Sequence, residues 1–183
     1  MSKENTSIVI LAAGKGSRMK SPKAKVLHHV SGKPMLYHII KASREISNDI
    51  TVVIAHQKEA VQEQMESFFE DIRFVVQDSE NFPGTGGAVM GITPKYEQVL
   101  VLNGDMPLIQ SSELKKFEDD ATIVMSVLNL KSADGYGRVV IENGNVVKIV
   151  EQKDASIKEL EINIANAGIY QFDTKFLLEY LPK

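Results

Sequence analysis

The chain carries short apolar runs that are continuous rather than alternating with polar residues. Such runs are typical of strands that are buried on both faces of a parallel sheet. They lie at residues 7–12 (SIVILA), 50–55 (ITVVIA) and 98–102 (QVLVL), with a further strand expected at 73–77. The segments between them favour helices, expected over 34–47, over 58–69, from about Gly86 and after a cap at Ser111 or Ser112. This order predicts an α/β fold in which helices flank a mostly parallel central sheet.

The pattern changes after residue 120. A β-branched run at 121–130 and the segments 138–142 and 145–151 predict strands, and Asn143-Gly144 strongly favours a two-residue hairpin turn between the last two. One more strand and a final helix are expected at 163–172 and 174–181. We therefore expect the sheet to carry an antiparallel extension in its second half.

No linker rich in Gly, Ser or Pro separates the two halves, so we expect one domain over residues 1–183. The sequence stops directly after the helical segment FLLEYL, and we expect this domain to be truncated at its C-terminal end. The chain has 183 residues, of which 43% are hydrophobic, and is therefore long enough and apolar enough to bury a core of its own.

Composition narrows the classes of function. No apolar stretch approaches the roughly 20 residues of a membrane span, and no apolar region behind a basic start marks secretion. The absence of cysteine excludes disulfides, thiol nucleophiles and thiolate metal sites. We therefore expect a cytoplasmic protein without a membrane partner. The four histidines lack a paired metal spacing and are assigned no role.

Charge is distributed unevenly along the chain. Between Glu4 and Glu45 there are eight cations and no acid, although the net charge is −3. A basic region confined to one part of an acidic protein is suited to a compact anion. Nucleic-acid binding is not expected, because the balance is acidic and only 7% of residues are aromatic.

The stretch LAAGKGSRMKSPKAK at residues 11–25 follows the first predicted strand. Gly14 and Gly16 permit a turn whose backbone N–H groups can face phosphate oxygens. The dinucleotide fingerprint G-x-G-x-x-G fails, because Met19 stands where the third glycine is required. No G-x-x-x-x-G-K-[ST] is present either, which excludes a P-loop. The loop therefore predicts a phosphate site of another kind at the carboxyl edge of the sheet.

The motifs LAAGKGSRM, KVLH and GKPM resemble the signature of sugar-nucleotide pyrophosphorylases, and KVLH is similar to that of the bacterial N-acetylglucosamine-1-phosphate uridyltransferases. Further motifs stand in the order found in that family: GTGGA at 84–88, NGDMPLI at 103–109, GYGRV at 135–139, IVEQKDA at 149–155 and NAGIY at 166–170. The resemblance spans nearly the whole chain and implies a Rossmann-like nucleotidyltransferase fold.

The resemblance also implies the reaction. It is the Mg²⁺-dependent transfer of a uridylyl group from UTP to N-acetylglucosamine-1-phosphate, giving pyrophosphate and UDP-N-acetylglucosamine for peptidoglycan and lipopolysaccharide synthesis. In this family the domain is commonly followed by an acetyltransferase β-helix that trimerises. These residues show no hexapeptide repeat, so a homotrimer is expected only of a longer parent protein.

Residue roles are carried over motif by motif. Arg18 and Lys25 are expected to bind the phosphates, where they can compensate developing charge, and Asp105 to bind Mg²⁺. The residues expected to bind the nucleotide are Leu11, Ala12, Ala13, Gly14, Gln77, Gly84, Thr85, Asn103 and Gly104. Those expected to bind the sugar are Gly137, Glu151 and Asn166.

The chain departs from the family's pattern at several places. Gly87 replaces a usual histidine, Asn103 replaces a frequent tyrosine, and Ala24 precedes Lys25 where proline is common, so Lys23 is an alternative phosphate ligand. A second magnesium ligand of the family, an asparagine, would lie beyond Lys183. A related transferase for CTP or another sugar phosphate, and a module that binds nucleotides without turnover, remain as alternative functions.

Overall fold

The computed structural model describes residues 5–16, 19–117 and 121–181. Contacts between Cα atoms group the chain into two units, one formed by Met1–Val124 with Gln171–Lys183 and the other by Met125–Tyr170. The single domain expected over 1–183 stays a prediction, because this grouping does not tell whether either unit folds alone.

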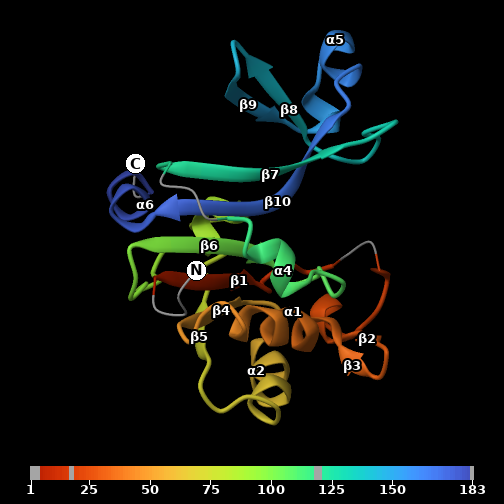
Figure 1. Ribbon diagram of the computed structural model, residues 1–183. Coiled ribbons are helices and arrows are strands. Elements are labelled where there is room, and N and C mark those ends of the chain that lie inside the picture. Colours follow the sequence, from red (N-terminus) through yellow and green to blue (C-terminus); the bar gives the residue numbers. More distant parts are fainter. Residues whose placement is uncertain (1–4, 17–18, 118–120, 182–183) are drawn as a thin grey trace. The chain divides into compact units, whose positions relative to one another are not determined.

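Four parallel strands form the sheet of the first unit in the order β5-β4-β1-β6 (Figure 1). They are β1 (Thr6–Leu11), β4 (Ile50–Ile54), β5 (Arg73–Val76) and β6 (Gln98–Asn103). The side chains of Ile8, Val9 and Ile10 in β1 are fully buried, as is expected of a central strand covered on both faces. Each strand lies within one residue of the run that predicted it.

The helices of the first unit differ from expectation mainly at their ends. Helix α1 (Met35–Arg44) begins after Pro34 and buries Leu36, Ile39 and Ile40, and both α1 and α2 (Lys58–Glu66) pack against β4. The shorter helices are α3 (Gly84–Ala88), α4 (Ser111–Leu114) and α6 (Thr174–Tyr180). None of the helices in the described part of the chain combines the length and the apolar character that crossing a membrane requires.

The predicted cap of α4 is wrong. The N-cap residue is Gln110 rather than Ser111 or Ser112, which lie inside the helix. The backbone N–H of Gln110 donates to the Glu113 carboxylate over 3.2 Å, one half of a capping box. The capping box with Glu113 therefore starts the helix one residue earlier than a cap at Ser111 would, and two earlier than a cap at Ser112.

Within the first unit, a 3₁₀ turn and a short hairpin were not predicted. A 3₁₀ turn, η2 (Lys25–Leu27), leads into a hairpin made by β2 (His29–Val30) and β3 (Lys33–Pro34). The turn residues Ser31 and Gly32 have φ angles of 48° and 80°, as a two-residue hairpin of type I′ requires.

A polar cluster closes the amino-terminal side of the first unit's sheet. The buried carboxylate of Asp49 accepts hydrogen bonds from the Ser7 hydroxyl at 2.6 Å and from the Lys95 backbone N–H at 3.0 Å. It also lies 2.6 Å from the Arg73 guanidinium. Asp49 thus satisfies three donors that come from different elements of the chain.

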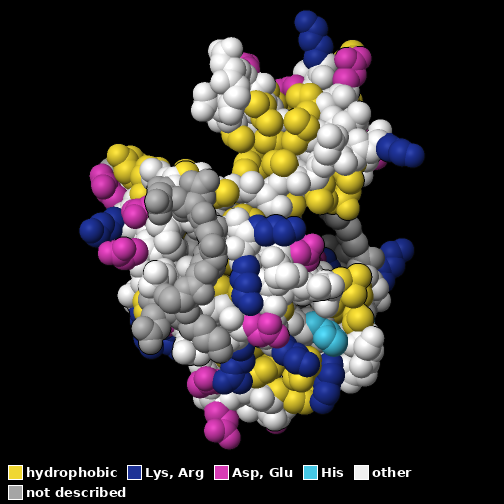
Figure 2. All heavy atoms as spheres, in the orientation of Figure 1, with side chains coloured by type: hydrophobic (Ala, Val, Ile, Leu, Met, Phe, Trp, Pro, Cys, Tyr) yellow, Lys and Arg dark blue, Asp and Glu magenta, His cyan; other side chains and the backbone are white. Residues whose placement is uncertain are grey.

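In the second unit, strand β8 (Arg138–Glu142) pairs antiparallel with β9 (Asn145–Val150) and with β10 (Ile164–Asp173), and β7 (Ile123–Asn129) also pairs with β10. The turn residues Asn143 and Gly144 have φ angles of 51° and 80°, which confirms the predicted hairpin. Most side chains along β9 are exposed, Val146 and Val147 among them. Figure 2 shows apolar side chains gathered over this hairpin.

A 3₁₀ turn, η3 (Gln152–Asp154), and a one-turn helix, α5 (Ile157–Leu160), follow β9. Ser156 and Glu159 form a capping box at the start of α5, and the Glu159 carboxylate lies 2.6 Å from the Lys148 ammonium. Hydrogen bonds lower the pKa of Glu159 from 4.5 to about 2, and the bond from Lys148 has a larger effect than those from Ser156. The ionised carboxylate thus ties α5 to β9.

Replacing Asp49 by alanine is expected to lower the free energy of unfolding by about 2–4 kcal/mol, because it leaves buried donors and a charged partner unsatisfied. Urea denaturation of the two proteins measures the difference. Asp71→Ala serves as the matched control, because the ion pair between Asp71 and Arg44 is exposed, and its removal should cost less than about 1 kcal/mol. Equal losses in the two variants would contradict this role for Asp49.

The lowered pKa of Glu159 predicts a defined pH dependence. Its ionised form is favoured by folding, so the contribution is complete above about pH 4.5 and is lost as the pH falls towards about 2. The destabilisation caused by Glu159→Gln should therefore shrink over that window. A titration of the carboxyl carbon by NMR should give a midpoint near 2, whereas a midpoint of 4.5 or above would refute the coupling.

Candidate active site

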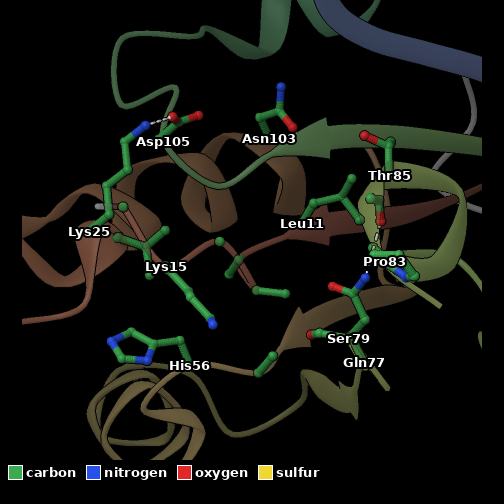
Figure 3. A pocket seen from close by; sticks show the side chains of 18 of the residues that line it. Leu11, Lys15, Lys25, His56, Gln77, Ser79, Pro83, Thr85, Asn103 and Asp105 are labelled. Carbon is green, nitrogen blue, oxygen red and sulfur yellow. Dashed lines mark hydrogen bonds and ion pairs between the residues drawn. The ribbon is translucent and has the colours of Figure 1, made fainter. Parts of the chain in front are cut away.

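A pocket of about 940 Å³ lies in the first unit, where its parallel strands end (Figure 3). Open α/β sheets bind ligands at this edge, and the volume is within the range of roughly 300–1,000 Å³ that small-molecule sites have. The lining comes from the segments directly after β1, β4 and β5, from the end of β6 and from the start of α3.

Most residues predicted to bind the nucleotide meet in this pocket. The described residues that line it include Leu11, Ala12, Ala13, Gly14, Gln77, Gly84, Thr85 and Asn103, together with Lys25 and Asp105. Gly104 is the exception, because its N–H donates to the Leu11 carbonyl oxygen over 2.8 Å and it joins the ends of β6 and β1 instead. Arg18 lies outside the described residues.

The glycine turn is shaped around the stem of Lys25. Gly16 has a φ angle of 59°, which disfavours other residues, and a Cβ atom built there would lie 2.7 Å from the Cβ of Lys25. A side chain at position 16 would therefore displace Lys25. The requirement for glycine here is a packing constraint as well as a conformational one.

An ion pair joins the two residues expected to act on the phosphates and the metal. The Lys25 ammonium donates to the Asp105 carboxylate, and both side chains remain about one third exposed, so solvent and ligands can reach them. Figure 3 shows this pair at one end of the pocket and Gln77, Pro83 and Thr85 at the other. The pocket thus has a charged end and an end lined by amide, hydroxyl and apolar groups.

The side chain of Gln77 is held in one orientation. Its Nε2 atom donates to the carbonyl oxygens of Phe82 at 3.0 Å and Gly84 at 3.1 Å. Carbonyl oxygens only accept hydrogen bonds, so the amide nitrogen must face them. The Oε1 atom is therefore the atom of this amide that is left to accept a hydrogen bond from a ligand.

Asp78, next to Gln77, brings a negative charge to the same side of the pocket. Hydrogen bonds from the Asn81 side chain and backbone stabilise the ionised Asp78 carboxylate and lower its pKa. The bonds also close a turn at residues 78–81. The loop between β5 and α3 is therefore held at its start by this turn and at its end by the Gln77 side chain, which binds Phe82 and Gly84.

His56 and Lys15 line the pocket as well, near its charged end (Figure 3). Sequence reasoning gave the histidines no role, but His56 comes two residues after the buried end of β4, at the same edge of the sheet as the glycine turn after β1. That position is the signal by which it could have been found. Lys23, the alternative to Lys25, lies instead on a shallow groove beside α2 with Leu27 and Gln57.

The space around position 87 explains why glycine stands there in place of the family's usual histidine. A Cβ atom at position 87 would lie 1.9 Å from the carbonyl oxygen of Phe82, a distance that no side chain tolerates. The backbone of Phe82 therefore occupies the space beside position 87. A histidine here would require a different path for the loop that precedes α3.

Metal binding is only partly supported by the geometry. Within the described residues, no group of three or more His, Asp or Glu side chains is arranged to hold a metal ion. Mg²⁺ is often bound by one or two carboxylates together with substrate phosphates and water, so Asp105 by itself fits a metal that arrives with a nucleotide. The described part of the chain thus offers no metal site of three or more such side chains that would be independent of substrate.

The three residues expected to bind the sugar lie together in the second unit. Gly137 accepts a hydrogen bond from the Asn166 backbone N–H over 2.8 Å, and a Cβ atom on Gly137 would lie 3.2 Å from the Glu151 carboxylate. The Asn166 side chain donates to the Tyr170 hydroxyl and accepts from the Gly168 N–H. Each Asn166 amide atom keeps capacity for one further hydrogen bond.

Comparison with known proteins agrees with the motifs. The sequence profile of the MobA-like NTP transferase domain matches residues 8–145. The bifunctional protein GlmU of Aliarcobacter butzleri is 72% identical over 177 residues, which cover 97% of this chain and 41% of the relative. The bifunctional protein GlmU of Sulfurimonas denitrificans is 60% identical over 183 residues, which cover 100% of this chain and 42% of the relative.

A solved structure supports the fold. The inositol-1-phosphate CTP transferase from T. maritima superposes with a TM-score of 0.74 at 17% identity, over 97% of this chain and 74% of that protein. Together these matches confirm the Rossmann-like α/β fold and the resemblance inferred from the motifs, and they show a nucleotidyltransferase domain. The chain spans about two fifths of the length of the curated relatives.

Replacing Gly87 by alanine is expected to lower the free energy of unfolding by about 1–3 kcal/mol, because the new methyl group collides with the backbone of Phe82. It should also weaken nucleotide binding, since the displaced loop carries Gly84. Gly86→Ala is the matched control: nothing lies within 4 Å of its Cβ position, and alanine favours helix there. Thermal unfolding and calorimetric titration with UTP measure both effects, and similar behaviour of the two variants would contradict the argument.

Proposed function

We propose that this chain, which belongs to the family of MobA-like NTP transferase domains, transfers a uridylyl group from UTP to N-acetylglucosamine-1-phosphate. Pyrophosphate and UDP-N-acetylglucosamine are the products, and the sugar nucleotide serves peptidoglycan and lipopolysaccharide synthesis in the cytoplasm. The observation that carries the proposal is the pairing of Lys25 with Asp105 beside the glycine turn, at one end of a pocket whose other end has a fixed amide acceptor.

The chemistry needs no protein nucleophile. A phosphate oxygen of the sugar phosphate forms a bond to the α-phosphorus of UTP while the bond to the pyrophosphate oxygen breaks. The protein contributes by holding the two reactants in line and by compensating negative charge. In the proposal, the N–H groups of the turn at residues 14–16 and the Lys25 ammonium face the phosphates, and Arg18 adds a second cation.

Asp105 has a role at the same end. Without a nucleotide it neutralises Lys25, and with one it can release Lys25 to the phosphates and bind the accompanying Mg²⁺ through its carboxylate oxygens. The metal, when bound, supplies further stabilisation of the negative charge on the phosphates. Lys15 lines this end and is suited to attract the anionic substrate, and the His56 imidazole can offer it a hydrogen bond.

The orientation of Gln77 favours uracil over cytosine. Its Oε1 atom can accept from the N3–H of uracil, whereas N3 of cytosine is itself an acceptor, so cytosine could reach Oε1 only through its N4 amine, in a shifted position. Gly84 and Thr85 lie beside it and let the base approach the backbone. This argument separates the proposal from the related CTP-dependent reaction.

For the acceptor, we assign Gly137, Glu151 and Asn166 to the N-acetylglucosamine moiety. The Glu151 carboxylate can accept from sugar hydroxyl groups, and the spare capacity of the Asn166 amide suits a hydroxyl or an acetamido group. A homotrimer is proposed only for a longer protein of which this chain would be one part.

The test is an assay of pyrophosphate release from UTP and N-acetylglucosamine-1-phosphate with Mg²⁺. We expect release with UTP, little with CTP, and none after chelation with EDTA. Lys25→Ala should lower kcat/KM by about 10²-fold or more, because a charge that faces the transferred group is removed. Lys23→Ala is the matched control and should change it by less than about threefold, since Lys23 lies on the other groove.

Other outcomes would decide between the alternatives. Calorimetric binding of UTP and UDP-N-acetylglucosamine without pyrophosphate release would favour a binding module. A preference for CTP would favour the related transferase and refute the role given to Gln77. A larger loss in Lys23→Ala than in Lys25→Ala would overturn the assignment of the phosphate ligand.

A further inference from the structure

Gln57 has an unusual position between β4 and α2. It is the N-cap residue of α2 and has φ and ψ angles of 53° and 40°, in the left-handed region that residues other than glycine, asparagine and aspartate seldom adopt. Such a conformation costs free energy and persists where surrounding contacts maintain it. The contacts of its side chain are therefore informative.

Both polar atoms of the Gln57 side chain bind the backbone of the basic loop. The Oε1 atom accepts from the Ala24 N–H over 2.9 Å, and Nε2 donates to the Pro22 carbonyl oxygen. An N–H group only donates and a carbonyl oxygen only accepts, so the orientation of this amide is determined by its partners. The side chain thus forms a two-point clamp on residues 22–24, more than thirty residues earlier in the chain.

The clamped segment leads directly into Lys25. Ala24 is 2% exposed and precedes the 3₁₀ turn η2, whose Val26 and Leu27 are buried. The first N–H groups of a helical turn have no partner within the turn. Gln57 supplies a partner for the Ala24 N–H, and it fixes the point from which the Lys25 side chain extends to Asp105.

The backbone of Ala24 suggests what the clamp does. Its φ angle is −52°, which lies within the range that a proline ring would impose. A proline has no N–H and restricts φ covalently, whereas alanine leaves φ free and exposes a donor. The two hydrogen bonds from Gln57 therefore restrain the backbone at Ala24 non-covalently, where the ring of a proline would restrain it covalently.

We propose that Gln57 is a positioning residue for Lys25, which it holds at the phosphate end of the pocket by clamping Pro22 and Ala24. The inference rests on the proposed function for its catalytic consequence, although the clamp itself does not. His56, the preceding residue, lines the same end of the pocket, so one loop both contacts the site and restrains the segment that carries its lysine.

The test compares Gln57 variants in two backgrounds. Gln57→Gly removes the clamp and also relieves the left-handed conformation, and Gln57→Asn keeps an amide that tolerates this conformation but is one methylene shorter. Each should lower kcat for uridylyl transfer by about tenfold, with a smaller change in the KM for UTP. In an Ala24→Pro background the same substitutions should cost less than about threefold, because proline restrains the segment independently.

A second readout does not depend on activity. Hydrogen exchange of the Leu27 and His28 amides, which donate to the carbonyl oxygens of Ala24 and Lys25, should become about tenfold faster in Gln57→Gly and return towards the parent rate with Ala24→Pro. Gln62→Ala is the matched control. Its amide binds only Glu66 on the same helix among the contacts of the described residues, so neither readout should change.

The outcomes separate the inference from the proposed function. If the parent protein transfers uridylyl groups and the Gln57 variants keep its kcat and exchange rates, the inference is wrong. It is also wrong if they lose the same factor in both backgrounds, since a general loss of stability would do that. If the parent protein shows no transfer, the proposed function fails, and the exchange experiment still decides whether the clamp exists.

Discussion

The parallel register of three strands is the constraint on which the rest of the site depends. At the carboxyl end of β1, Leu11 is paired with Val53 of β4 on one side and with Asn103 of β6 on the other. Backbone hydrogen bonds extend this alignment by one residue, from Ala12 to Val53 and from Gly104 to Leu11, both 2.8 Å long. Because the strands end flush, the segments that follow them must meet at one edge, whatever side chains they carry.

The pairing of Lys25 with Asp105 follows from that edge. Asp105 comes two residues after the end of β6, and Gly104 lets this segment pass close to Leu11, where a Cβ atom would lie 3.0 Å from the Leu11 carbonyl oxygen. Lys25 arrives from another part of the chain and is located by Gly16 on one side and by the clamp from Gln57 on the other. Because both residues are fixed in this way, each charge in the pocket has an opposite charge beside it, and the Lys25 ammonium keeps one position.

The sequence was sufficient wherever a single segment determines the outcome. The buried strands and the Asn143-Gly144 turn were predicted to within a residue because burial on both faces and positive φ angles leave a direct mark on composition. Other local signals were present but not used, namely Ser31-Gly32 in the β2–β3 turn and Ser156 with Glu159 at the start of α5. Motifs located most of the pocket, but they contain no information on the orientation of the Gln77 amide or on the position of His56 in the pocket lining. Those features depend on carbonyl oxygens and strand ends contributed by other segments.

Two departures from the family's motifs show why such features are visible only in the three-dimensional structure. At position 87 the missing side chain is matched by the backbone of Phe82, which lies in the space that a Cβ atom would need. At position 24 alanine, where proline is common, is matched by a glutamine more than thirty residues away that binds the additional N–H. In both cases the altered residue and its counterpart belong to different segments, so neither change can be judged from its motif alone. A substitution that looks disruptive in one motif is compatible with the site when the segment that faces it has changed as well. Packing constrains the substituted residue and its facing segment together, rather than either one alone.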